Sequence, residues 1–319
     1  MRFWLWVNLI ITVGLFTVTL IFLVRRAVRE RRLTTELALY LATLSLGWME
    51  AVIDWGAFVY YSTMWAHFPT DWPVVRLIPI LPLHIPLCYT WFFFGGAWMG
   101  VKLAKALMHR WPRLNMNVAL IGCGLFVGFA LDFVVENFFI SVGGLWTYTQ
   151  VWGPLSLRGG TDTQWPIYMG FAMALSIAPY TYLLGKRNDR GEDLIAVAVR
   201  SFSLHRRARA TQPVAAMNLA VAGTATTVDA PPAPTSRTAT GSRRPNWVLY
   251  LLSWVVVVHV VYGTVSLGYA VLRWTGVQKT VSTVEPYPDG KAWYDGIVTK
   301  PDDPDLNREP IGAAVRAGL

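Results

Sequence analysis

The chain has 319 residues, of which 54% are hydrophobic, and its formal net charge is +9. A mean hydropathy of +0.39 is too high for an ordinary soluble domain and indicates an integral membrane protein. The positive charge does not indicate a nucleic-acid partner, because most basic residues lie in a few segments between long apolar runs.

A bilayer-spanning helix needs about 20 predominantly apolar residues, and six stretches of the chain qualify. We therefore expect an all-α, polytopic membrane protein with about six transmembrane helices. The first stretch is too long for the core of a signal peptide and lacks a small-residue cleavage site, so we interpret it as a retained helix. The stretches are Phe3–Val24, Glu36–Tyr60, Leu81–Met108, Asn117–Ile140, Pro166–Leu184 and Trp247–Leu272.

The basic residues predict the orientation of these spans, because cytoplasmic loops are enriched in Lys and Arg. They follow the first span, separate the third from the fourth, and separate the fifth from the sixth, which makes these three alternate loops cytoplasmic. We predict a multi-pass protein of the plasma membrane with both termini outside the cytoplasm. The residues concerned include Arg25, Arg26, Arg29, Arg31, Arg32, Lys102, Lys105, Arg110, Arg113, Lys186, Arg187 and Arg190.

Composition divides the chain into four parts. Residues 1–187 hold the first five spans, and residues 247–272 form the sixth. Residues 188–246 form a cytoplasmic loop that we expect to be largely disordered, because the stretch Ala230–Ser236 is rich in Ala, Pro, Thr and Ser. Residues 193–204 could form a short surface helix within that loop. Residues 273–319 form an external tail, which could be disordered or could cap the outer face.

The sequence carries no common metal, nucleotide or nucleophile motif. It contains no HExxH, Walker A, GxSxG or EF-hand pattern, and its five histidines form no two-histidine helical motif. Cys88 and Cys123 both lie in predicted spans and are interpreted as packing residues. We therefore expect neither a metal nor another cofactor.

Two pairs of carboxylic acids interrupt the apolar spans. Glu50 and Asp54 lie in the second span, and Asp132 and Glu136 lie in the fourth. A spacing of four residues places each pair on one helix face. Both spans are predicted to run outwards, and the first acid of each lies about 14–15 residues from the cytoplasmic end, or about 21–23 Å into a core of about 30 Å. The two pairs should therefore lie at one depth, in the outer half of the bilayer.

Buried ionisable residues in membrane helices usually face the bundle interior and mark a functional site. A protonated carboxyl can donate a proton to a hydroxyl or carbonyl oxygen, and a nearby carboxylate can stabilise the resulting cation and accept a proton. We predict Glu50 and Asp132 as the deeper catalytic acids and Asp54 and Glu136 as their outer partners. Which of them donates stays open. In the alternative reading, each acid only hydrogen-bonds a Trp or Tyr donor, or holds helices together.

Polar and aromatic residues near the predicted outer ends of the spans are candidates for binding a substrate. Two arginines among them could neutralise the acids or bind a substrate carboxylate, and ordinary loop ion pairing or contact with lipid headgroups is the alternative. The candidates are Trp55, Tyr61, Arg76, His84, Asn137, Trp146, Tyr148 and Arg158.

Several segments resemble the spirocyclase AveC-like family of actinobacterial integral membrane proteins, over residues 36–185. The resemblance implies dehydration and spiroketal closure of a polyketide. We therefore expect a metal-independent, acid-catalysed cyclase and dehydratase whose partners are membrane lipids and a hydrophobic polyketide- or lipid-like substrate. The segments that carry the resemblance are Gly47–Glu50 with Asp54-Trp55, Leu81–Pro86, Asp132-Phe133 with Glu136-Asn137, and Leu145–Tyr148.

A lipid or small-molecule transporter, or a membrane scaffold, is the competing prediction. Proton-coupled transporters also bury acids, and they favour interrupted helices with Gly or Pro at the breaks. Prolines lie in or beside the third and fifth predicted spans and leave that alternative open; they are Pro79, Pro82, Pro86, Pro166 and Pro179.

Overall fold

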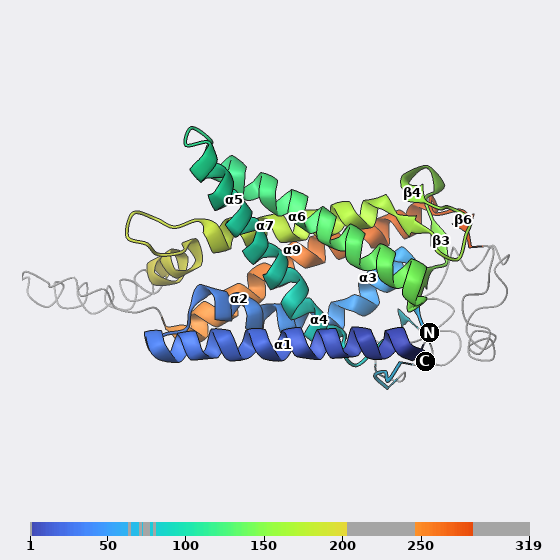
Figure 1. Ribbon diagram of the computed structural model, residues 1–319, viewed down its shortest axis with the longest axis horizontal. Helices are drawn as coiled ribbons and strands as arrows, with labels where there is room; N and C mark the ends of the chain where they lie inside the picture. Colours follow the sequence, from blue (N-terminus) through green and yellow to red (C-terminus); the bar gives the residue numbers. More distant parts are fainter. Residues whose placement is uncertain are drawn as a thin grey trace, which may run out of the picture.

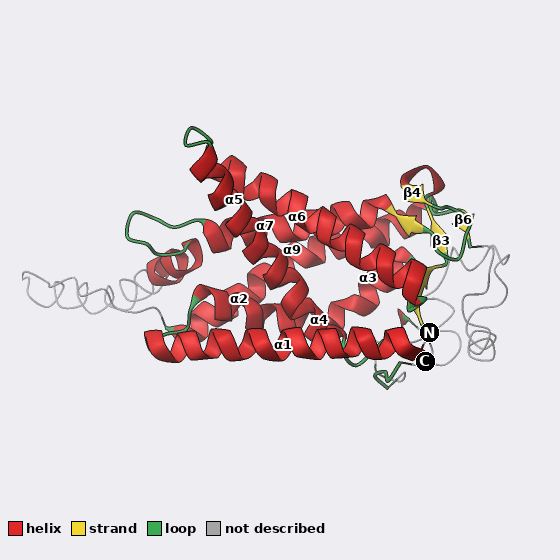
Figure 2. Cartoon of the chain, in the orientation of Figure 1, coloured by secondary structure: helices red, strands yellow, loops and turns green. Residues whose placement is uncertain are grey.

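The computed structural model describes residues 2–62, 65–69, 72, 77–78, 81–202 and 246–282 (Figure 1). These residues form a bundle of long helices with short strands gathered at one end (Figure 2). The long helices are α1 (Arg2–Glu30), α5 (Gly95–Arg110), α6 (Met116–Phe138), α7 (Ile167–Gly185) and α9 (Trp247–Thr275). The predicted all-α, polytopic class is confirmed.

Two of the predicted spans are built from shorter helical segments. The second consists of α2 (Thr35–Leu44), a 3₁₀ segment η1 (Ser45–Met49) and α3 (Glu50–Ala57). The third consists of α4 (Ile85–Tyr89), a π-helical turn η3 (Thr90–Phe94) and α5. The 3₁₀ segment of the second span packs on α4 of the third, since a Cβ on Gly47 would lie 2.5 Å from Cγ of Pro86.

Five helical stretches of the described residues are long and apolar enough to cross a membrane. Together with the stretch formed by α4, η3 and α5, they agree with about six predicted spans. Most of the predicted loop and tail, residues 203–245 and 283–319, lies outside the described residues, although residues 194–202 are helical. The five stretches are Phe3–Glu30, Thr35–Ala57, Met116–Gly143, Ile167–Gly185 and Trp247–Thr275.

The three spans that begin at the basic end of the bundle each have a side chain that caps the first turn. Oγ1 of Thr34 accepts a hydrogen bond from the amide of Leu37 at 3.2 Å, at the start of α2. Asn115 and Asn246 accept in the same way at the starts of α6 and α9. Such caps satisfy amide groups that have no partner within the helix, and they fix where each helix begins.

The strands form three antiparallel pairs at the end of the bundle opposite those caps (Figures 1 and 2). The pair that matters for the site joins β1 (Val59–Tyr61), which follows α3, to β2 (Trp146–Tyr148), which follows α6 and the π turn η4 (Phe139–Gly143). The other pairs are β3 (Gln150–Val151) with β6 (Thr280–Val281), and β4 (Ser156–Leu157) with β5 (Trp165–Pro166). The 3₁₀ turn η5 (Gly153–Leu155) connects β3 to β4.

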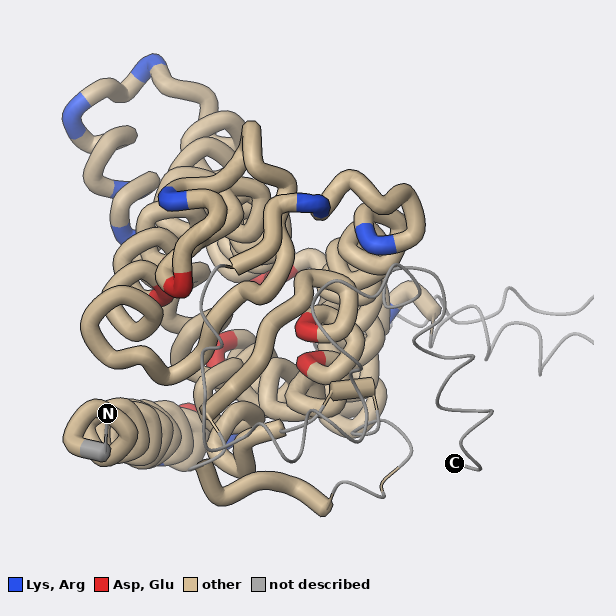
Figure 3. Tube along the Cα trace, turned by 90° about the vertical axis from the view of Figure 1, so that its right-hand side faces the viewer, with Lys and Arg blue, Asp and Glu red and all other residues tan. Residues whose placement is uncertain are grey.

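The view onto the strand end shows acidic positions between the helices as well as basic positions towards the margin of the bundle (Figure 3). The pairing of β1 with β2 sets the register of the two acid-bearing helices, because Tyr61 lies opposite Trp146 and Val59 opposite Tyr148.

The closest helix contact lies between α6 and α7 and depends on small residues. A Cβ on Gly124 would lie 2.6 Å from Cα of Ala178, and one on Gly128 would lie 2.7 Å from Cα of Ala174. Glycines four residues apart let two membrane helices approach at backbone distance. This contact holds α7 against the helix that carries Asp132 and Glu136.

We predict that Gly124→Ala or Gly128→Ala lowers the free energy of unfolding by about 1–3 kcal/mol, because each added methyl overlaps the backbone of α7. Gly122→Ala is the matched control on the same helix, since nothing lies within 4 Å of its Cβ position. Denaturant unfolding in detergent micelles measures all three. Equal losses for Gly122→Ala and Gly124→Ala would contradict the proposed packing.

Candidate active site

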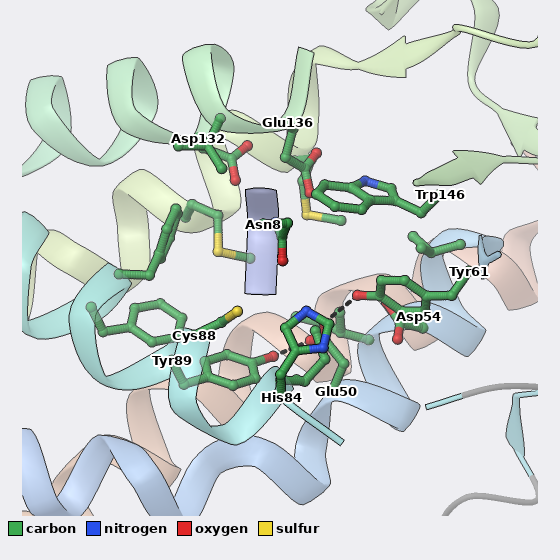
Figure 4. Close-up of a pocket in the computed structure, with 18 of the residues that line it drawn as sticks. Asn8, Glu50, Asp54, Tyr61, His84, Cys88, Tyr89, Asp132, Glu136 and Trp146 are labelled. Carbon is green, nitrogen blue, oxygen red and sulfur yellow. Dashed lines mark hydrogen bonds between the residues drawn. The ribbon is translucent and has the colours of Figure 1, made fainter. Parts of the chain in front are cut away.

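A cavity of about 120 Å³ lies within the bundle, and all four acids line it (Figure 4). Glu50 and Asp54 of α3 form one wall, and Asp132 and Glu136 of α6 form the opposite wall. The remaining lining comes from the same two helices, from the residue before α4, and from α1, β1, α4, η3, β2, α7 and α9. These lining residues are Asn8, Ile53, Val59, Tyr61, His84, Ile85, Cys88, Tyr89, Trp91, Phe92, Phe93, Val135, Trp146, Tyr148, Met169, Met173 and Tyr262.

The four acids form one electrostatically connected set. Each pair shares a helix face at a spacing of four residues, as the sequence predicts. Across the cavity, Asp54 interacts electrostatically with Glu136 as well as with Glu50, and Glu136 interacts with Glu50. Asp132 interacts with Glu136 on its own wall. A charge on Glu136 therefore affects acids on both walls.

The two glutamates are held by hydrogen-bond donors. Oε1 of Glu50 accepts a hydrogen bond from the Tyr61 hydroxyl at 2.6 Å, and Oε2 accepts one from Tyr89, whose hydroxyl also contacts that of Tyr262. These donors come from β1 and α4, and Tyr262 comes from α9. Glu50 is therefore fixed by three different parts of the chain.

Glu136 is fixed through a single oxygen. Its Oε2 accepts hydrogen bonds from the Tyr148 hydroxyl at 2.6 Å and from Nε1 of Trp165 at 2.7 Å. An indole N–H can only donate, so Oε2 must act as an acceptor in this arrangement. Hydrogen bonds to a charged acceptor are about twice as strong as neutral ones.

The phenols of the two strands stay protonated and able to donate. Burial, followed by the negative charge of Glu136, holds the pKa of Tyr148 well above its ordinary value. Burial, followed by the charges of Asp54 and Glu50, does the same to the pKa of Tyr61. Each tyrosine is therefore a neutral donor at physiological pH.

The two aspartates are buried but lack such partners. Asp54 and Asp132 are each 2% exposed, and Oδ2 of each has no hydrogen-bond partner among the described residues. An unpaired buried polar atom costs about 1–3 kcal/mol. The two walls thus share one pattern, in which a fixed glutamate lies four residues from an aspartate with a free oxygen.

The other predicted binding residues separate into two groups. Tyr61, His84, Trp146 and Tyr148 line the cavity, and the His84 ring packs on Trp65 with centroids 4.2 Å apart.

The second group does not belong to the lining. The Arg273 guanidinium lies over the ring of Trp55, with its Cζ atom 4.8 Å from the ring centre. Arg158 donates a hydrogen bond to Oδ1 of Asn137 at 2.5 Å on an exposed surface, which occupies both side chains. Arg76 lies outside the described residues.

Sequence reasoning did not select three residues that shape this site, namely Asn8, Tyr89 and Tyr262. Each is a polar side chain in an otherwise apolar helix, and the same pattern indicated the four acids. Tyrosine is common near membrane interfaces, which obscures that signal for Tyr89 and Tyr262.

Within the described part of the chain, no group of three or more His, Cys, Asp or Glu side chains could hold a metal ion. The chemistry that these side chains can perform themselves is proton transfer between carboxyl groups in a cavity enclosed by aromatic rings.

Fold and cavity together define a polytopic helical membrane protein with a buried carboxyl site. The chain belongs to the spirocyclase AveC-like family, whose sequence model matches residues 30–231. This confirms the predicted resemblance, and the match includes both acid pairs. No curated protein and no solved structure matches the chain.

We predict that Tyr148→Phe lowers the free energy of unfolding by about 1.5–3 kcal/mol, the usual contribution of a hydrogen bond to a charged group. Tyr182→Phe is the matched control, because its hydroxyl has no hydrogen-bond partner in the described ranges. Denaturant unfolding of both variants in detergent micelles gives the comparison. An equal effect of the two substitutions would show that the Tyr148–Glu136 hydrogen bond adds no stability.

Proposed function

We propose that the protein is a membrane-embedded, acid–base cyclase and dehydratase that closes a spiroketal on a hydrophobic polyketide- or lipid-like substrate. The observation that carries this proposal is the arrangement of the acids: two opposed pairs, each with one hydrogen-bonded glutamate and one aspartate with a free oxygen. Membership of the spirocyclase AveC-like family supports a cyclase-like role.

The arrangement supports one assignment of the roles that the sequence leaves open. Asp54 and Asp132 are the proton donors, because their unpartnered oxygens are free to contact a substrate oxygen. Glu50 and Glu136 are the carboxylates, because phenol and indole donors already stabilise their oxygens. The aromatic lining shelters a cation by attraction to the ring faces.

The reaction begins from a hemiketal formed by the substrate's ketone and one of its hydroxyls. An aspartic acid donates its proton to the hemiketal hydroxyl, the C–O bond breaks, and water leaves with the electron pair. The carboxylate across the cavity stabilises the resulting oxocarbenium ion. A second substrate hydroxyl attacks the cationic carbon, and its proton passes to a glutamate.

One water is lost overall, and the proton balance closes within the site. The accepting glutamate is the one on the same helix as the donating aspartate, four residues away, so proton transfer from the glutamate to the aspartate restores the starting state. For dehydration without closure, a carboxylate removes a proton from the carbon next to the cation, which leaves a double bond.

The size of the cavity limits what it can enclose. Pockets for drug-sized ligands have volumes of about 300–1,000 Å³, whereas this cavity holds about 120 Å³. It accommodates the reacting ketal carbon and its neighbours, and the remainder of a longer substrate extends between the helices towards lipid.

A transporter of lipids or small hydrophobic molecules is the second candidate. Two adjacent helix interruptions favour it, namely η1 (Ser45–Met49) beside the Glu50 wall and η3 (Thr90–Phe94), whose Phe92 and Phe93 line the cavity. Transporters often place interrupted helices at the binding site. Loss of one water from the substrate separates the cyclase from the transporter, which leaves its cargo unchanged.

We predict that Asp132→Asn or Asp54→Asn, whichever replaces the donating aspartic acid, lowers cyclisation by roughly 10²–10⁴-fold, because an amide cannot donate the catalytic proton. Their thermal stability is retained, since the replaced Oδ2 has no partner in the described ranges. The assay uses purified protein in lipid nanodiscs and a symmetrical nine-carbon dihydroxyketone, with mass spectrometry of the spiroketal formed.

Asp162→Asn is the matched control for this assay, because Asp162 lies in an exposed loop between the strands. Glu50→Gln also loses activity, since it removes a proton acceptor. Full activity in both cavity aspartate variants would refute the acid mechanism and favour transport.

We propose that the protein lies in the plasma membrane with the strand end of the bundle on the side away from the cytoplasm, because the basic segments lie at the other end. A reporter fused after Arg32 or Arg113 is expected to be cytoplasmic, and one fused after Trp72 is expected to be external. Fluorescent and phosphatase reporters measure the two sides independently. A cytoplasmic signal after Trp72 would reverse the orientation.

A further inference from the structure

Helix α1 packs against the edge of the bundle with only a narrow inward face. Large apolar side chains such as Trp6, Ile10 and Phe22 are exposed along its length, as expected for a helix in contact with lipid. Two polar side chains point inwards, Asn8 and Thr12, which are 6% and 0% exposed. Their spacing of four residues places them on one face.

These two inward polar groups differ in their partners. Oγ1 of Thr12 lies 3.2 Å from Sγ of Cys88 on α4, so its hydrogen-bonding capacity is used within the protein. Oδ1 of Asn8 is buried and has no hydrogen-bond partner in the described structure. A buried amide oxygen without a donor is unfavourable in an apolar bundle, so packing alone does not account for an asparagine at this position.

Asn8 lies in the lining of the acid cavity. Figure 4 shows its side chain between the wall formed by Asp132 and Glu136 and the wall formed by Glu50 and Asp54. Among the described residues of this lining, Asn8 of α1 is therefore the one neutral amide, and the other strongly polar groups are chiefly acids and phenols. Residues 30–231 match the family model, so Asn8 lies outside the part of the chain that the family description covers.

We infer that Asn8 is a specificity-determining residue that binds a hydroxyl group of the substrate. Its Oδ1 accepts a hydrogen bond from that hydroxyl, and its amide group stays neutral throughout because it does not titrate. It thereby holds one hydroxyl in place while the acids act on the ketal carbon. This inference rests on the proposed function, since it assumes a hydroxyl-bearing hydrophobic substrate.

The test uses two probes that cannot react, since neither contains a ketone. One is a straight nine-carbon chain with hydroxyls on its first, middle and last carbons, and the other carries the middle hydroxyl alone. Calorimetry in lipid nanodiscs measures their binding to wild type, Asn8→Leu and Thr17→Val. Thr17 is exposed on the same helix and provides the matched control.

Wild type and Thr17→Val are expected to bind the triol roughly tenfold more tightly than the mono-alcohol, the ratio that one net hydrogen bond supplies. Asn8→Leu is expected to bind the two probes equally. It also retains or raises the unfolding temperature, because it removes a polar atom that has no partner in the described structure. A purely structural asparagine would instead lower the unfolding temperature on substitution.

The inference is overturned if Asn8→Leu keeps the tenfold preference, or if its loss of binding accompanies a fall in unfolding temperature. Failure of wild type to bind either probe overturns it together with the proposed substrate class. If the probe preferences are as expected but wild type does not cyclise the dihydroxyketone, the cyclase proposal falls and hydroxyl recognition by Asn8 stands.

Discussion

Carboxylates can remain inside an apolar helix bundle only if the protein replaces the hydrogen bonds that water would supply. Much of the strand end of this protein serves that requirement. Tyr61 and Tyr148 reach the glutamates from the paired strands β1 and β2, and Trp165 reaches Glu136 from β5. The donors of Glu50 also include Tyr89. The strands are therefore part of the site, since without them both glutamates would lose a partner.

The same requirement explains how the two acid-bearing helices end. The α3 helix ends at Phe58, and the segment that continues α6 ends at Gly144, both in the left-handed conformation with φ of 56° and 58°. Each turn redirects the chain into a strand, and the two strands then pair. Arg273 of α9 holds the first turn in place, because its guanidinium donates to the Trp55 carbonyl and packs 3.9 Å from the Phe58 ring centre.

The sequence predicted the parts of this site that depend on helix periodicity. A spacing of four residues is enough to place Glu50 with Asp54, and Asp132 with Glu136, on one face each. The equal depth of the two pairs followed from their equal distance from the basic segments, and the structure brings both pairs to one cavity.

Prediction from the sequence failed for residues that directly follow an acid in the chain, since Trp55 and Asn137 were predicted to bind a substrate but do not line the cavity. Successive residues of a helix are rotated by about 100° around its axis. Trp55 follows Asp54 and Asn137 follows Glu136, so each turns away from the cavity that its neighbour faces. Tyr89, Tyr262 and Asn8 could not be assigned for a different reason: their contacts join segments far apart in the chain, and no local pattern specifies which helices meet.

The polar atoms of the cavity fall into two kinds. Some are hydrogen-bonded within the protein and hold their side chains in place, and others have no partner in the described structure and are free to contact a ligand. Both oxygens of Glu50 and Oε2 of Glu136 accept hydrogen bonds from protein donors, which fixes the two side chains before any ligand arrives. Oδ2 of Asp54, Oδ2 of Asp132 and Oδ1 of Asn8 lack partners in the described structure, and these acceptors belong to three different helices. A molecule with several oxygen atoms would satisfy them together, whereas a hydrocarbon tail would satisfy none. Under the proposed function, the unpaired atoms would contact a polyoxygenated reacting centre, and the apolar parts of the substrate would contact the aromatic lining and the surrounding lipid.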